Sequence, residues 1–472
     1  MEAPIGADRG ESHGSAVVPA VYSPHAVSVM RSLAERDVRT IAAYERATPA
    51  LGSRFCDESV LVPDPEDDLE GYRDALLSLA RRPAVRAIVP MREVDVYVLS
   101  RHRSAFARHV DPTWPSFEAV RAAHDRLRLL EAARDAGVGV PETTLLGEVD
   151  DWTPRQVLKP RFAFLTTDYV DETVTRPREP GSVRYLDRGV EPDVAEVRTE
   201  MDHDPLVQTY VPGEEYALWA LYIDGEPAVT CGKRQVRGQT YAGGTSVYRE
   251  TVRVPGLEAA GRRLLDRLEW HGLASVQFKR DPETGAFTLL EVNPRVWVSV
   301  ACPALAGVDF TDAYWRMATG GSVTQPDYET GVGTHRLLGE AMYLLSVARD
   351  DDLFVESPPI GAAVREVLAS IADQPNFDYL ALDDPVPFVR DVLEKVIHRT
   401  VGTPADPADR QKDRPMAHSG ISSDTEMGAD GAVGADREID QKEGVDQGVD
   451  WDVEADRDVE ADGGPSGGDG AA

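Results

Sequence analysis

The sequence contains very little lysine. Lysine and arginine together number 50, and the six lysines are Lys159, Lys233, Lys279, Lys395, Lys412 and Lys442. Acidic residues number 82, which gives a formal net charge of −32. A protein this acidic repels phosphate backbones and anionic lipid, so we expect neither nucleic acid nor a membrane surface as a partner. An acidic surface with few lysines is also the composition expected of a protein that works in concentrated salt.

Cysteine is equally scarce. Cys56, Cys231 and Cys302 are isolated and odd in number, with no Cys-x-x-Cys spacing. This argues against a disulfide framework and against a cysteine metal site, and it predicts reduced thiols in an intracellular protein. No run of eighteen apolar residues occurs, and the N-terminus lacks a basic segment followed by an apolar core. We therefore expect a cytoplasmic protein without a membrane span or signal peptide.

A glycine-rich dinucleotide fingerprint is also absent. The first strand-like run, 16–22, leads into Ser-Pro-His rather than Gly-x-Gly-x-x-Gly, which argues against a nucleotide-dependent oxidoreductase. Strand-like and helix-like segments then alternate, at 26–35, 38–44, 59–62, 72–80 and 87–90. Such alternation predicts a parallel sheet covered on both faces. We expect a flexible N-terminus over 1–15 and an α/β substrate domain over 16–115.

The most informative stretch runs from Ala274 to Val300, ASVQFKRDPETGAFTLLEVNPRVWVSV. Two strand-like runs, 274–279 and 287–292, flank a polar turn and predict a hairpin. Folding it brings the oxygen donors Gln277 and Glu291 to one edge, with Asn293 on the same face as Glu291. Three such ligands suit Mg²⁺. Arg295 follows as a permanent cation that could stabilise a transferring phosphoryl group.

Taken alone, Glu-x-Asn-Pro-Arg is equally compatible with an ordinary surface hairpin. The longer pattern, Gln277 followed fourteen residues later by Glu291 and then by Asn-Pro-Arg, resembles the metal-binding segment of ATP-grasp enzymes such as carbamoyl phosphate synthetase and biotin carboxylase. The resemblance covers roughly residues 16 to 320. It implies an α+β, two-lobed ATP-grasp domain over 116–330 that clamps Mg-ATP, with Mn²⁺ as a possible substitute.

The resemblance also implies phosphate-binding roles for two cations. A long helix predicted over 117–136 contains Asp125-Arg126, where family members usually have Asp-Lys and the lysine meets ATP phosphates. Arg126 keeps the charge but changes its geometry. Lys159, on a strand over 156–160, is expected beside the α- and β-phosphates; a snorkelling surface lysine is the alternative. The family's glycine-rich loop has no counterpart in 161–167.

A second segment resembles the hinge between the two lobes. The strand 206–210 leads into Val-Pro-Gly-Glu-Glu. The resemblance places Gln208, Tyr210 and Val211 at the adenine edge and Glu215 on the ribose hydroxyls. An acidic turn on an acidic protein is the alternative for Glu215, and its neighbour Glu214 should point the other way.

A hairpin closed by Asp224-Gly225 is expected to deliver Lys233, Arg234 and Arg237. Three cations within five residues suggest an anionic ligand, and the family role of Lys233 is at the phosphates. The turn 243–246 is a further candidate for covering a phosphate or a substrate carboxylate.

A helical extension is expected over 331–400. Residues 401–472 hold 19 acidic and 6 basic residues and a near-repeat of Asp-Val-Glu-Ala-Asp, which predicts a disordered tail.

These features predict a ligase that activates a small-molecule carboxylate as an acylphosphate and transfers it to an amine, or to a thiol, releasing ADP and phosphate. Arg126, Lys159 and Lys233 would neutralise phosphates, and Gln277, Glu291 and Asn293 would hold one or two Mg²⁺. Arg295, with Lys233, would act on the transferring phosphoryl group. A non-catalytic ATP-binding regulatory protein is the alternative, and a homodimer is a family-level expectation.

Overall fold

A computed structural model describes residues 13–19, 25–170, 176–181, 183–349, 352 and 354–401, the last six by their backbone alone. The predicted flexible N-terminus up to residue 12 and the predicted disordered tail from residue 402 lie outside these residues. None of the helices in the described part combines the length and apolarity that a membrane span requires.

The chain begins with a four-stranded parallel sheet in the order β3-β2-β1-β4. Its elements are β1 (Ser15–Pro19), α1 (His25–Ala34), β2 (Arg39–Tyr44), η1 (Pro49–Gly52), β3 (Glu58–Leu61), α2 (Leu69–Ala80), β4 (Val85–Ile88), α3 (Glu93–Arg101) and α4 (Arg103–Phe106). The predicted α/β sheet is confirmed, with element bounds that differ by a few residues. The predicted end of the first strand, from residue 20, lies outside the described residues.

Alternate residues of β1 enter two different cores. Ala16 and Val18 pack in the cluster that contains α1, whereas Val17 packs in the cluster that contains α2 and α3. Because successive side chains of a strand point to opposite faces, helices cover both faces of the sheet. The strand order reverses its direction between β1 and β4, and α/β sheets bind ligands beyond the carboxyl ends of strands at such a reversal.

The prediction of one continuous helix over 117–136 is wrong. The structure has two helices, α5 (Phe117–His124) and α6 (Arg126–Asp135). Between them Asp125 has an extended backbone, and its carboxylate accepts a hydrogen bond from the Leu127 N–H as the N-cap of α6. The same carboxylate pairs with Arg161 through Nε at 3.0 Å and Nη2 at 2.8 Å. A capping side chain with a tertiary partner has outweighed the helical periodicity on both sides of it.

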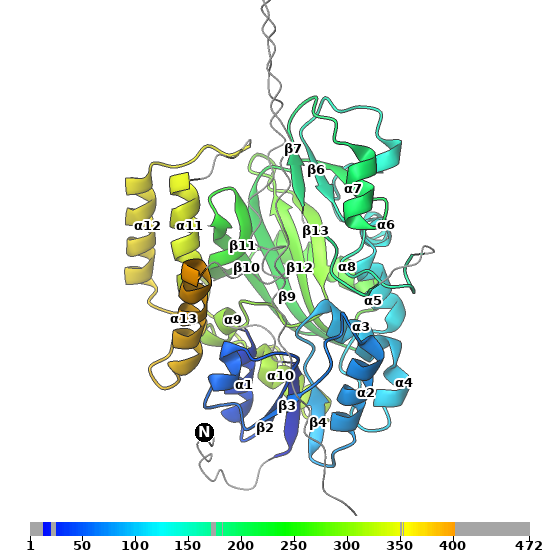
Figure 1. Cartoon of the computed structure of the whole chain (residues 1–472), viewed down its shortest axis with the longest axis vertical. Helices are drawn as coiled ribbons and strands as arrows, with labels where there is room; N and C mark the ends of the chain where they lie inside the picture. Colours follow the sequence, from blue (N-terminus) through cyan, green and yellow to red (C-terminus); the bar gives the residue numbers. More distant parts are fainter. Residues whose placement is uncertain are drawn as a thin grey trace, which may run out of the picture. The chain divides into compact units, whose positions relative to one another are not determined.

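A small antiparallel sheet in the order β5-β8-β6-β7 follows. Its elements are β5 (Thr143–Leu145), η2 (Leu146–Glu148), β6 (Gln156–Lys159), β7 (Arg184–Leu186), α7 (Val194–Met201) and β8 (Leu206–Thr209). Leu158 and Val207 pack on the α7 residues Val197 and Met201, so α7 covers one face. Lys159 and Gln208 belong to the other face. In Figure 1 this sheet and α7 lie at the top of the view.

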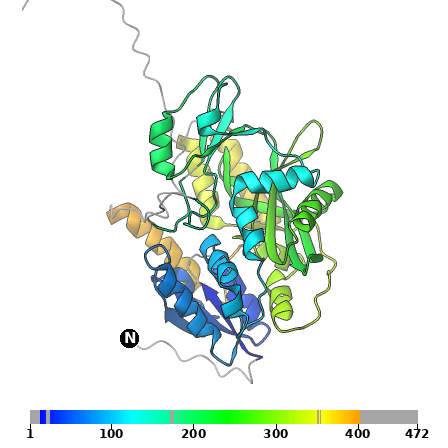
Figure 2. The same ribbon diagram turned by 90° about the vertical axis from the view of Figure 1, so that its right-hand side faces the viewer.

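The large sheet has the order β13-β12-β9-β10-β11-β14, and all its neighbouring strands are antiparallel. Its elements are β9 (Glu214–Ile223), β10 (Glu226–Thr240), β11 (Gly243–Val252), α8 (Pro255–Arg267), β12 (Gly272–Arg280), β13 (Phe287–Asn293) and β14 (Gly333–His335). Helices α5, α6 and α8 pack on one face, and Figure 2 shows the cyan helices against the green strands. The predicted turn at 243–246 is instead the start of β11. The sheet also continues past the predicted domain end at 330.

The remaining helices are α9 (Ala301–Leu305), α10 (Phe310–Ala318), α11 (Leu337–Arg349), α12 (Ile360–Asp373) and α13 (Val386–Val401). Helix α10 packs with α1 of the N-terminal domain, and α11 and α12 pack beside β11. Two buried ion pairs join the large sheet to the C-terminal helices and the segment between them, Arg237 with Glu340 and Arg249 with Asp378. Figure 1 shows α11 and α12 at one edge of the sheet and α13 below them, beside α1.

Candidate active site

A row of predicted site residues crosses one face of the large sheet. Tyr216, Leu218 and Ala220 of β9 pack against α6 and α8, so Ala217 belongs to the opposite face. The strand register places Glu291 opposite Gln277, Gln277 opposite Ala217, and Ala217 opposite Lys233. Four neighbouring strands therefore align the predicted metal ligands with a predicted phosphate-binding lysine. The small Ala217 side chain separates them.

A chain of hydrogen bonds continues along the end of β13. Asn293 Nδ2 donates to Glu291 Oε1 at 3.0 Å, and Arg295 Nη2 donates to Asn293 Oδ1 at 3.2 Å. Glu291, Asn293 and Arg295 are half-buried, whereas the residues between them are buried. The alternation shows that all three side chains point to one face, which the sequence predicted for Glu291 and Asn293.

The small sheet and α6 bring two further cations to this row. Arg126, the first residue of α6, donates from Nη1 to the Pro160 carbonyl at 2.8 Å and lies 3.6 Å from Glu291 Oε2 through Nη2. Burial lowers the pKa of Lys159 to about 8, Arg126 adds to the shift, and Glu291 and Glu215 oppose it. Lys159 is thus within electrostatic range of both sheets.

Glu215 lies among lysines. It forms an ion pair with Lys279 at 3.1 Å, directly across from it on β12. Burial lowers the pKa of Lys233 to about 8, and Glu215 opposes that shift. Lys233 Nζ also donates to Gln235 Oε1 at 3.1 Å. Glu214 pairs with Arg234 at 2.7 Å and bonds the Tyr216 hydroxyl, so it points to the other face as expected.

The site is cationic within a strongly acidic protein. The five cations are Arg126, Lys159, Lys233, Lys279 and Arg295. The carboxylates are Glu93, Glu215 and Glu291. Because charged groups avoid burial without a counter-ion, this excess of buried and half-buried cations is suited to a polyanionic ligand.

The hinge segment carries the predicted adenine-edge residues. Gln208 is buried and donates from Nε2 to Thr143 Oγ1 at 3.1 Å. The Tyr210 N–H is already bonded to the Arg155 carbonyl at 2.9 Å, so it does not serve as a free donor to a base. Within the described residues the Val211 N–H has no such partner. The Tyr210 ring lies 4.9 Å from the ring of Phe354, between α11 and α12.

Two of the three cations predicted to form one anion site lie elsewhere. Arg234 points to the opposite face of β10 from Lys233 and pairs with Glu214. The register of β10 shifts between Gln235 and Arg237, and Arg237 is buried in an ion pair with Glu340. The prediction that Lys233, Arg234 and Arg237 share a ligand is therefore wrong, because strand alternation and a β-bulge separate them.

Sequence reasoning missed two buried residues at the site. Glu93, at the start of α3, accepts from Arg295 Nε at 2.9 Å, and its other oxygen lies 3.0 Å from His124 Nε2. His124 is fully buried. Its adjacency to Asp125-Arg126 was the one available signal. Glu93 is separated from Arg295 by 202 positions, and no local pattern joins them.

The predicted magnesium ligands fit a hard cation in their chemistry. Gln277, Glu291 and Asn293 offer oxygen atoms on one face, and Glu291 is the one carboxylate among them. The described ranges hold no group of three His, Cys, Asp or Glu side chains placed to bind a metal. A cation at this row would depend on ligand oxygens from elsewhere, as Mg²⁺ bound with a nucleotide does.

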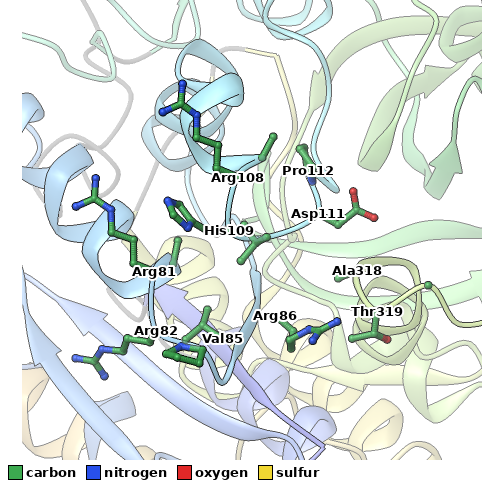
Figure 3. A pocket seen from close by; sticks show the side chains of 15 residues that line it. Arg81, Arg82, Val85, Arg86, Arg108, His109, Asp111, Pro112, Ala318 and Thr319 are labelled. Carbon is green, nitrogen blue, oxygen red and sulfur yellow. The ribbon is translucent and has the colours of Figure 1, made fainter.

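A separate hollow of about 640 Å³ lies where α2 ends, lined by residues that include Arg81, Arg86 and Arg108. Figure 3 shows Arg81 and Arg108 extending to one side and Arg86 to the other, toward Thr319. The guanidinium groups do not converge, and none of the predicted site residues lines this hollow. It is distinct from the row described above.

Comparison with known proteins gives one family match. Residues 201–336 match a family described as ATP-grasp in the biosynthetic pathway with Ter operon. The matched residues include the hinge, Lys233 and the whole stretch from Gln277 to Arg295. A protein of Emericella nidulans named as a urea carboxylase is 24% identical over 325 residues, covering 62% of this chain and 25% of its own. The chain thus spans about a quarter of that relative's length.

Solved structures share the fold at low sequence identity. The biotin carboxylase domain of Hydrogenobacter thermophilus 2-oxoglutarate carboxylase, a dimer with MgADP, ADP and bicarbonate, is 16% identical. It aligns over 68% of this chain and 74% of its own with a TM-score of 0.53. Staphylococcus aureus N5-carboxyaminoimidazole synthetase with ADP is 12% identical over 69% and 83% of the two chains, with a TM-score of 0.51. The match over residues 201–336 and the similar solved structures together show that the chain has an ATP-grasp fold.

Proposed function

We propose that the protein is an ATP-dependent ligase that joins a small-molecule carboxylate to an amine through an acylphosphate. The observation that carries the proposal is the aligned row of Glu291, Gln277 and Lys233, facing Lys159 and Arg126 in a protein of net charge −32. The similar structures that hold MgADP or ADP support a nucleotide at this position.

In the first step a substrate carboxylate oxygen attacks the γ-phosphorus, the bond to the bridging oxygen breaks, and ADP leaves. In the second step the amine nitrogen attacks the acyl carbon, phosphate leaves, and the nitrogen loses a proton. Lys159, Lys233 and Arg126 would hold the phosphates and compensate their charge. Arg295 would stabilise the negative charge on the transferring phosphoryl oxygens. Positioning and charge supply most of the catalysis in such transfers.

Magnesium would neutralise phosphate charge and order the phosphate oxygens when bound. Gln277, Glu291 and Asn293 would hold it. Glu215 would accept from the ribose hydroxyls once a nucleotide competes for its partner Lys279, and the Val211 N–H would donate to the base. The Tyr210 N–H is not proposed as a donor to the base, because it is bonded to the Arg155 carbonyl.

The test is release of ADP and phosphate from Mg-ATP in high-salt buffer, against pooled amino acids and small carboxylates. Glu291→Gln should lower substrate-dependent release about a hundredfold, because it removes the carboxylate of the predicted metal site. Glu214→Gln is the matched control, since that carboxylate lies on the other face of the same sheet. It should stay within about twofold of the parent protein.

The other outcomes discriminate between functions. Binding of ATP without release in any pool would contradict the ligase and support a non-catalytic ATP-binding protein. Absence of ATP binding would contradict both.

A further inference from the structure

The loop after β4 joins the N-terminal domain to the end of β13. The Val296 N–H donates to the Pro90 carbonyl at 3.0 Å, and the Tyr314 hydroxyl of α10 donates to the Ile88 carbonyl at 2.9 Å. This loop lies at the carboxyl end of β4, beside the reversal of strand order where α/β sheets bind ligands. Helix α3 follows this loop directly, and its first residue is Glu93.

Both oxygens of Glu93 are engaged. Oε1 accepts from Arg295 Nε at 2.9 Å, and Oε2 lies 3.0 Å from His124 Nε2. Glu93 is 5% exposed and His124 is fully buried. Burial alone would raise the pKa of Glu93, but Arg295 and His124 outweigh it, and the pKa lies below its usual range. The carboxylate is therefore a buried, ionised group held by the Arg295 guanidinium on one oxygen and by His124 on the other.

The orientation of His124 is set on its other side. Its Nδ1 lies 3.1 Å from the Tyr169 hydroxyl. A neutral imidazole that donates from Nε2 to Glu93 and accepts from Tyr169 satisfies all these groups at once. His124 can thus hold the Glu93 carboxylate in one rotamer.

The guanidinium of Arg295 is held at three points. Nε donates to Glu93, Nη1 to the Val296 carbonyl at 3.1 Å, and Nη2 to Asn293 Oδ1 at 3.2 Å. Two of these partners are local to Arg295. Glu93 is the partner that comes from the N-terminal domain. Its bond to Nε restricts rotation of the guanidinium plane about the side-chain bonds of Arg295.

We propose that Glu93, oriented by His124, is a positioning residue that sets the guanidinium of Arg295 for the transferring phosphoryl group. The inference rests on the proposed ligase function. It makes the N-terminal domain a part of the phosphoryl-transfer site through the chain of contacts from His124 to Glu93, Arg295, Asn293 and Glu291. Removing Glu93 would leave Arg295 present but free to turn away.

The experiment compares Glu93→Gln with Asp95→Asn. Asp95 is a buried carboxylate on the same helix, bonded to the Arg92 side chain, the Tyr72 hydroxyl and the Met91 and Arg92 N–H groups, none of which belongs to the site. Glu93→Gln should lower kcat about ten- to hundredfold while the dissociation constant for ATP stays within about twofold, because misplacing a catalytic group affects the transition state most. Asp95→Asn should lower stability and leave kcat unchanged. Equal effects of the two variants on kcat, or a loss in ATP affinity with kcat unchanged, would overturn the proposal.

A second pair of variants covers the case in which Glu93→Gln does not fold. His124→Gln keeps a donor toward Glu93, whereas His124→Leu removes it. We expect His124→Gln to retain most of kcat and His124→Leu to lose it about tenfold. Similar kcat values for the two would contradict the role of His124 in orienting Glu93.

Failure of the ligase function gives a different result. A parent protein without turnover contradicts the proposed function. Then a double-mutant cycle of Glu93→Gln and Arg295→Lys in urea unfolding tests the contact itself, and additive effects would show that the two residues are uncoupled. A parent with turnover whose Glu93→Gln variant matches Asp95→Asn contradicts the positioning inference alone.

Discussion

Two lysines at the site combine burial with a nearby carboxylate. Lys159 and Lys233 each have a pKa lowered to about 8 by burial, and Glu215 limits both shifts. At pH 8 each amine is therefore about half protonated in the free protein. A phosphate group beside such an amine favours the charged form and raises its pKa.

Binding of ATP at pH 8 should therefore take up protons, about half a proton for each of the two lysines that contacts phosphate. Titration calorimetry in buffers of different ionisation enthalpy measures this uptake. Adenosine, which lacks phosphates, is the control and should take up none. The affinity for ATP should also fall as the pH rises above 8, because the free lysines then lose their protons. An equal heat of ATP binding in all buffers at pH 8 would contradict the assignment.

The spacing of the chain predicted the placement of some candidate site residues and not of others. Gln277, Glu291 and Asn293 lie on a two-stranded hairpin, and alternation within short strands is a local property that the sequence contains. The predicted position of Arg237 beside Lys233 was wrong, because a register shift in β10 turns the Arg237 side chain away from Lys233. Glu93 could not be predicted, since its role depends on a contact between two domains.

At the scale of elements, Asp125 has the largest local influence. It ends α5, caps α6, pairs with Arg161, and so places Arg126 at the site. The alternation of strands and helices predicted the parallel sheet, because both faces of it are buried. It did not predict the break at Asp125, since apolar residues keep a helical spacing on both sides of the break. The break depends on one side chain and its distant partner.

Asp125→Ala should destabilise the protein by about 2 to 4 kcal/mol, because it removes a helix cap and leaves Arg161 without its carboxylate. Urea unfolding measures the change. Asp193→Ala is the control, since Asp193 caps the exposed N-terminus of α7 through the Ala195 and Glu196 N–H groups alone. Asp193→Ala should lower the free energy of unfolding by about 1 kcal/mol. Equal losses of stability in the two variants would show that the ion pair with Arg161 contributes nothing to stability.

At the scale of the molecule, two buried arginines of the large sheet find their counter-ions in the C-terminal region. Arg237 pairs with Glu340 through Nε and Nη2, both at 3.0 Å, and Arg249 pairs with Asp378 with both side chains fully buried. Breaking a buried ion pair from one side leaves an uncompensated charge. The sheet and the C-terminal helices are therefore energetically dependent on each other.

Asp378→Asn should lower the free energy of unfolding by about 3 to 5 kcal/mol, because it leaves the Arg249 guanidinium buried without a negative partner. Asp327→Asn provides the comparison. Asp327 pairs with Arg253 on the surface, where Asp327 is 98% exposed, and such pairs contribute about 1 kcal/mol or less. Thermal or urea unfolding of the whole chain distinguishes the two. A small effect of Asp378→Asn would show that water or backbone carbonyls compensate Arg249.

The same two ion pairs restrict how this protein could be recombined with its relatives. A chimaera with a crossover near residue 330 would keep Arg237 and Arg249 from one parent. It would take the positions of their acidic partners, Glu340 and Asp378, from the other parent. Such chimaeras would contain two buried arginines without counter-ions, unless the segment from the other parent has acidic residues at the positions of Glu340 and Asp378. We therefore expect the C-terminal helices to be inherited together with the large sheet, and chimaeras to succeed with breakpoints before Arg237 or after Asp378, which keep both ion pairs within one parental segment.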